Sequence, residues 1–163
     1  MPGKTGICSV AVAVAVAGCG SSGSSTSGSS TSGSKTVPKA QIISQGDAIC
    51  SKLGQTVGSG PNVDPAKATG KQLMELAPFL TKNADVISSE VSQVSALGTP
   101  DKDAALFDQV LADGRTAASY FREAATAAAT GNRTAFLAAF QKLMAQTPHG
   151  KAFGFRHCDV PTS

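Results

Sequence analysis

Residues 73–97 read LMELAPFLTKNADVISSEVSQVSAL, and this stretch decides the fold of the chain. Apolar or small residues recur in it at helical spacing, in two interleaved series of seven-residue steps: Leu73, Leu80, Ile87 and Val94, and Ala77, Ala84 and Val91. The two series form one stripe, which predicts a long amphipathic helix that partner helices must cover. Pro78 removes one backbone hydrogen bond, but the stripe keeps its phase across it. We therefore expect one kinked but continuous helix, which begins at Pro65 or Thr69 and ends at Leu97.

The rest of the chain supplies helical segments of the kind that such a stripe needs. Apolar residues at helical spacing predict three of them: Pro38–Val57, Thr99 to about Thr130, and Arg133 to about Gln146. We expect Thr99–Pro100 to start one helix and Asn132 to cap the next, because these residue types favour helix N-termini. Thr147–Pro148 would cap a last short turn that Gly154 ends. Because short links join the segments, the prediction is an all-α, up-down four-helix bundle with a short C-terminal helical turn.

Residues 1–18 have the features of a secretory signal. Lys4 is followed by the apolar run Ile7–Ala17, which is too short for a transmembrane helix of about 20 residues. The ending Val16–Cys19 resembles the bacterial lipobox. This resemblance implies cleavage between Gly18 and Cys19 and attachment of lipid, including palmitate, to Cys19. The alternative is an ordinary secreted protein in which this cysteine occurs by chance.

A tether is expected between the lipid and the folded domain. Residues 20–34 are only Ser, Gly and Thr, a composition that cannot bury apolar surface. We therefore expect residues 19–36 to be a lipidated cysteine followed by a disordered spacer, and residues 37–163 to form the bundle domain. The spacer is either plain or O-glycosylated. The membrane would be a partner through the lipid, on the outer face of the bacterial cytoplasmic membrane.

The cysteines have different expected fates. Cys8 lies in the segment that the signal would lose. Cys50 and Cys158 would share an oxidising compartment, where we expect them to form one disulfide that ties the bundle together. The alternative is a pair of thiols for metal or redox chemistry, which is disfavoured because the chain has no Cys-x-x-Cys motif.

Several of these features occur together in one group of proteins. Cys19 in a lipobox, a low-complexity tether, Cys50 in the first helix and Gly154–Phe155 shortly before Cys158 resemble uncharacterised alanine-rich helical lipoproteins of actinobacteria. The resemblance implies an extracytoplasmic location and a helical fold. The resemblance implies no particular biochemical activity.

No motif in the sequence indicates catalysis, a cofactor or a metal. His149 and His157 lie near Cys158 and Asp159, but their spacing matches no zinc site. There is no Gly-x-Ser-x-Gly sequence, and three glutamates read as isolated residues on solvent-facing surfaces: Glu75, Glu90 and Glu123. The net charge of +3 is too small to indicate a nucleic-acid partner.

Four phenylalanines are the candidates for an apolar ligand pocket near one end of the bundle, with ordinary core packing as the alternative: Phe136, Phe140, Phe153 and Phe155. The first functional hypothesis is a non-enzymatic interaction or structural module that contacts an unknown protein or envelope partner. The alternative is a carrier or sensor that binds a small apolar or amphipathic ligand inside the bundle.

Overall fold

The computed structural model describes residues 36–57 and 60–158 of the chain. The predictions for the signal, for lipidation at Cys19 after Gly18, and for nearly all of the tether lie outside these described residues. So does Asp159.

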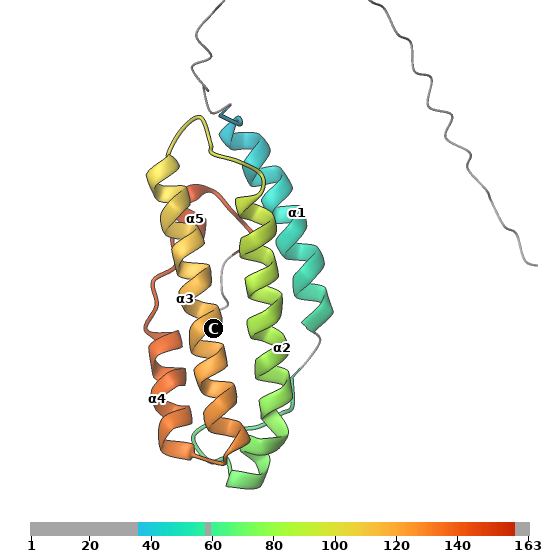
Figure 1. Ribbon diagram of the computed structural model, residues 1–163, viewed down its shortest axis with the longest axis vertical. Helices are drawn as coiled ribbons and strands as arrows, with labels where there is room; N and C mark the ends of the chain where they lie inside the picture. The colour runs from blue at the N-terminus through green and yellow to red at the C-terminus, as the bar shows by residue number, and fades with distance from the viewer. Residues whose placement is uncertain (1–35, 58–59, 159–163) are drawn as a thin grey trace, which may run out of the picture. The chain divides into compact units, whose positions relative to one another are not determined.

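The described residues form five helices, and the four long ones alternate in direction along the bundle (Figure 1). They are α1 (Lys39–Val57), α2 (Gly70–Ser95), α3 (Ala104–Ala129), α4 (Arg133–Met144) and the short α5 (Gly150–Phe153). α2 and α3 share the most extensive contact, while α1 packs on α2 and α4 packs on α3. No strand forms in this part of the chain. The prediction of an up-down four-helix bundle with a short C-terminal helical turn is confirmed.

α2 contains the predicted stripe and continues through Pro78, as expected. Its start is at Thr69 and not at Pro65, which lies in a separate turn. The reason is a capping box: the Gln72 backbone N–H donates to Thr69 Oγ1 at 3.3 Å, and the Thr69 backbone N–H donates to Gln72 Oε1 at 2.9 Å. These two bonds satisfy backbone donors that a helix start otherwise leaves unpaired.

α3 begins at Ala104, so the predicted start at Thr99–Pro100 is wrong. The Val37 backbone N–H donates to the Thr99 carbonyl at 2.8 Å, and the Asp101 N–H donates to the Val37 carbonyl at 2.8 Å. Because these backbone groups bond to the segment before α1, residues 99–101 form an extended bridge with Val37. Tertiary hydrogen bonds have therefore overridden a favourable local helix signal.

The same loop anchors the start of α1. The Lys39 backbone N–H donates to Asp101 Oδ1 at 2.8 Å, which caps α1 from outside its own sequence. Lys39 Nζ pairs with Asp103 Oδ2 at 2.7 Å and lies 4.6 Å from the centre of the Phe153 ring. Asp103 is the N-terminal cap residue of α3 and has a φ of 58°. The first turn of α1 is thus tied to α3 and to α5.

The two last helices follow the predictions in part. Asn132 caps α4, because its side chain accepts the Ala135 N–H at 3.1 Å. α5 has no cap from Thr147–Pro148; the preceding residue, His149, instead donates its backbone N–H to Asp113 Oδ2 of α3 at 2.8 Å. Gly154 ends α5 with a φ of 117°, a conformation that favours glycine.

The core consists of two clusters along the bundle. The first joins α2, α3 and α4 and is called the α4 cluster; its largest members are Leu73, Leu76, Leu80 and Phe136. The second joins α1, α2, α3 and the C-terminal segment and is called the α5 cluster; its members are Ile42, Cys50, Val94, Phe107, Leu111, Phe153 and Phe155. Alanines of α3 complete the α4 cluster and allow neighbouring helices to approach closely.

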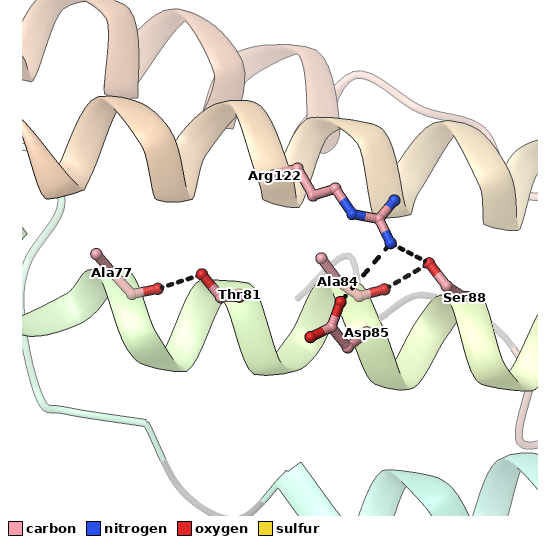
Figure 2. Close-up of polar contacts among 6 residues, drawn as sticks. All are labelled: Ala77, Thr81, Ala84, Asp85, Ser88 and Arg122. Carbon is pink, nitrogen blue, oxygen red and sulfur yellow. Dashed lines mark hydrogen bonds and ion pairs between the residues drawn. The ribbon is translucent and has the colours of Figure 1, made fainter.

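A polar contact joins the middle of α2 to α3. Figure 2 shows Arg122 of α3 between two side chains of α2, with Nη2 donating to Ser88 Oγ at 2.7 Å and lying 3.7 Å from Asp85 Oδ1. The Ser88 hydroxyl in turn donates to the Ala84 carbonyl at 2.7 Å. An exposed ion pair contributes little free energy, and the hydrogen bond from Arg122 to Ser88 adds a second polar contact between α2 and α3.

The C-terminal segment is bound to α1 by a covalent bond and by hydrogen bonds. Cys50 and Cys158 form the predicted disulfide, with 5.2 Å between their Cα atoms. The backbone N–H groups of Arg156 and His157 donate to Asp47 Oδ1 at 2.8 and 2.9 Å. Gly46 makes room for the segment, because a Cβ at this position would lie 2.5 Å from Cε1 of the Phe155 ring.

We expect Cys50→Ser to lower the stability of the domain strongly. The disulfide closes a loop across a separation of 108 residues, and the chain-entropy model assigns such a loop roughly 4–5 kcal/mol. The melting temperature should fall by about 10 °C or more, measured by circular dichroism. The double variant Cys50→Ser/Cys158→Ser is the matched control and should have the same melting temperature as the single variant. Labelling of Cys158 by a thiol reagent in the folded wild-type chain, located by peptide mass, would contradict the disulfide.

Candidate functional site

A cavity of about 410 Å3 lies between α1, α2, α3 and the segment that follows α4. Most of its wall is apolar. α2 contributes Phe79, Val86, Ile87, Val91 and Val94, α3 contributes Val110, Leu111 and Phe121, and the C-terminal segment contributes Pro148 and Phe155. The disulfide also lines it, so the bond that fixes the C-terminal segment closes one side of the cavity.

The cavity interrupts the apolar stripe of α2. Leu80 and Ala84, which precede it along the helix, are 5% and 0% exposed, and Val94, the last stripe residue on the cavity wall, is 4% exposed. Ile87 and Val91, between them, are half-buried and line the cavity. One stripe thus serves as core up to Ala84 and as a cavity wall from Ile87 to Val94, and Val94 belongs to the α5 cluster as well.

Two glycines shape the space. Gly114 of α3 lies against Val91 of α2, because a Cβ at Gly114 would be 2.4 Å from Val91 Cγ2. The absence of a side chain there lets α2 and α3 approach each other next to the cavity. Gly54 of α1 also lines the cavity, and a Cβ built on it would meet no atom within 4 Å. The space is therefore open beside α1.

Among the described residues, four polar side chains line the cavity, and they differ in what they already bind. Asn83 donates from Nδ2 to the Phe79 carbonyl at 2.9 Å. Asp113 Oδ2 accepts the backbone N–H of His149 and lies 2.8 Å from His149 Nδ1. His157 is exposed at the edge. Glu90 is half-buried, and its carboxyl forms no hydrogen bond or ion pair with any described residue.

Burial has an electrostatic consequence for Glu90. Removal of water from around the carboxyl raises its pKa from the ordinary value of 4.5 to about 7, because the charged form loses hydration that no described residue replaces. A carboxyl with a pKa near neutrality, in an apolar cavity, is characteristic of functional sites.

The interpretation of Glu90 as a solvent-facing residue is therefore wrong. The sequence contains a signal that identifies it: Val86, Ile87 and Val94 lie four residues before, three residues before and four residues after Glu90. These positions share a helix face with Glu90. The apolar character of that face makes a solvated carboxylate there improbable.

The four phenylalanines proposed for a pocket do not lie together. Phe136 belongs to the α4 cluster and stacks on Phe140, with 6.1 Å between the ring centres. Phe153 and Phe155 belong to the α5 cluster, with 5.1 Å between theirs. Of the four, only Phe155 lines the cavity. The prediction is wrong because α4 and α5 pack at different levels along α3, a separation that sequence spacing does not show.

The two histidines also have separate positions. His149 lies against Asp113, whereas His157 is exposed. Among the residues that the structure describes, no group of three or more His, Cys, Asp or Glu side chains is arranged to hold a metal ion. The cavity has a largely apolar wall with a few polar side chains, which is the usual character of a small-molecule site.

We expect Glu90 to make the stability of the domain depend on pH. Between about pH 4.5 and 7 the folded chain keeps a proton on Glu90 that the unfolded chain releases, so the free energy of unfolding falls as the pH rises through this window. The other titratable side chains on the cavity wall are Asp113 from α3 and His157 from the C-terminal segment; α1 contributes none among the described residues.

Glu90→Gln should remove this dependence and, above pH 7, raise stability by roughly 1 kcal/mol once solvent screening of a half-exposed group is allowed for. That corresponds to about 4 °C in melting temperature, measured by circular dichroism from pH 4 to 9. Glu75→Gln, at an exposed position of the same helix, is the control and should melt like the wild type. If the melting temperatures of the wild type and Glu90→Gln change with pH in the same way, burial of Glu90 does not raise its pKa as described.

Comparison with known proteins adds no relative. No protein-family model, curated protein or solved structure matches this chain. The function must therefore be inferred from the cavity and from the sequence.

Proposed function

We propose that this chain is an extracytoplasmic lipoprotein whose helical domain binds a small apolar or amphipathic ligand in the cavity between α1, α2 and α3. The cavity is the observation that carries the proposal. Its volume of about 410 Å3 lies in the range of small-molecule sites, which are mostly apolar with a few polar groups.

The energetics of packing support an occupant. Protein interiors are close-packed, whereas apolar side chains that line an open hollow lack dispersion contacts with other protein atoms and leave apolar surface in water. The wall here includes three aromatic rings, those of Phe79, Phe121 and Phe155. A ligand that fills the space would recover those contacts and stabilise the folded chain.

The hypothesis of an interaction module receives less support. It calls for an exposed apolar patch on α2 or α3. Among the described residues, the large apolar side chains that are exposed are Met74 on α2 and Met144 on α4, which lie on different helices. Single exposed apolar residues are ordinary on protein surfaces. That hypothesis stays a prediction.

The proposed location rests on the sequence. Cys19 follows an apolar run and small residues, and a Ser/Gly/Thr tether follows Cys19. None of the described helices combines the length and apolar character that crossing a membrane requires. Attachment through lipid on Cys19 would place the cavity outside the cell, joined to the membrane through the Ser/Gly/Thr segment.

We expect Cys19→Ala to abolish membrane attachment. The wild-type chain, expressed in a bacterial host, should partition with membranes and incorporate labelled palmitate, and the variant should do neither. Cys8→Ala is the matched control, because Cys8 lies within the signal, and it should behave like the wild type. Incorporation of palmitate by Cys19→Ala would overturn the lipobox interpretation.

We expect the cavity to bind the neutral apolar dye N-phenyl-1-naphthylamine. The test uses the full chain with Cys19→Ser, secreted into an oxidising compartment so that the disulfide forms. Dye fluorescence should rise on binding, and Ile87→Trp should weaken binding about tenfold or more, because the larger side chain occupies cavity volume. Native mass spectrometry of the same sample should show a bound mass that leaves on denaturation.

Met74→Trp is the control for this substitution, since it adds an indole to an exposed position of the same helix. It should bind the dye like the parent chain. Circular dichroism must show that both variants fold. The proposal fails if the parent chain neither binds the dye nor carries a mass, or if both tryptophan variants bind equally well.

A further inference from the structure

We propose that the ligand is an amphipathic amine, whose ammonium group pairs with the Glu90 carboxylate while its apolar body lies in the cavity. The inference rests on the proposed function, because it concerns the same cavity and names the chemical class of its occupant.

The available polar groups point to this class. Asn83 and Asp113 are already hydrogen-bonded within the protein, and His157 is exposed at the edge. Glu90 therefore stands out as the cavity carboxyl that no described residue binds. A half-buried acidic group without a partner is destabilising, and a ligand that supplies donors removes the penalty.

The sign of the charge selects the ligand further. No lysine or arginine is among the described residues that line the cavity, whereas Glu90 and Asp113 both are. A fatty acid would bring a carboxylate next to Glu90, and two like charges in a poorly hydrated space repel. An ammonium group is attracted instead, and its hydrogen bonds to a carboxylate are charge-assisted and strong.

The surroundings of Glu90 fit the rest of such a molecule. On α2, Ile87 and Val94 flank it on the same face and line the cavity with it. An alkyl or aryl body extending from the ammonium group would contact these aliphatic side chains and the aromatic wall near Phe121. The arrangement places one charged contact within an apolar enclosure, the pattern that a molecule with one polar end requires.

Binding should also depend on pH. An alkyl ammonium group stays protonated below about pH 10, so the change of affinity with pH depends on the ionisation of Glu90. The other titratable groups at or beside the cavity wall are Asp113, His149, which lies against Asp113, and His157. Because the pKa of the Glu90 carboxyl is raised to about 7, the ligand meets a mostly neutral partner at pH 6 and a mostly ionised one at pH 8. Affinity should increase by up to about tenfold between these values.

The test compares three probes of equal chain length: dodecylamine, dodecanol and dodecanoate, each below the concentration at which it forms micelles. Isothermal titration calorimetry on the full chain with Cys19→Ser, its disulfide formed, should give the highest affinity for dodecylamine at pH 8 and the lowest for dodecanoate. Glu90→Gln should weaken dodecylamine binding about tenfold or more, remove its pH dependence and leave dodecanol binding within about twofold. Glu75→Gln, exposed on the same helix, should change none of these values.

The outcomes separate this inference from the proposed function. If dodecanol or dodecanoate binds as tightly as dodecylamine, or if Glu90→Gln leaves dodecylamine binding unchanged, the amine assignment is overturned while the cavity keeps its role. If none of the three probes binds, the amine assignment fails as well. The proposed function then stands or falls with the dye and the native mass measurement, which do not depend on charge.

Discussion

The disulfide between Cys50 and Cys158 holds the C-terminal segment on α1, and one half of the bundle depends on that attachment. α1 packs mainly on α2, and it is joined to α3 by the pairing of Lys39 with Asp103 and by the α5 cluster, where the rings of Phe107 and Phe153 lie 5.3 Å apart. A covalent bond across 108 residues restricts the unfolded chain and keeps this small cluster assembled. The disulfide therefore fixes both the position of α1 and one side of the cavity.

The cavity follows from this construction. α2 and α3 approach closely at Gly114. α1 packs on α2, and residues of α1 and of the C-terminal segment complete the cavity wall. The cavity adjoins the α5 cluster, whose members Cys50, Val94, Leu111 and Phe155 form part of its wall. When the space holds no ligand, the apolar side chains of its wall stay in contact with water, and a ligand that covers them would stabilise the folded chain.

Glu90 also lowers the stability of the folded chain, because its half-buried carboxyl has no partner among the described residues. A glutamine or an apolar residue there would avoid the cost of burying a carboxyl without a partner. Local violations of the rules for a stable core concentrate at functional sites, where the cost is offset by what the group does for a ligand. The half-buried carboxyl and the apolar wall around it are the two features on which the proposed binding site rests.

Much of the fold was determined by the sequence alone. The seven-residue stripe from Leu73 to Val94 specified α2, and local residue types specified the cap at Asn132 and the end at Gly154, because periodicity and capping are short-range properties of a helix. The pairing of Cys50 with Cys158 was predicted from the count of cysteines together with the expectation of an oxidising compartment. Only the tertiary structure decided that Ile87 and Val91 line a cavity, that Glu90 faces it, and that Phe136 and Phe155 belong to different clusters. An apolar stripe has the same pattern whether it meets a partner helix or empty space, and only the partners' packing distinguishes the two.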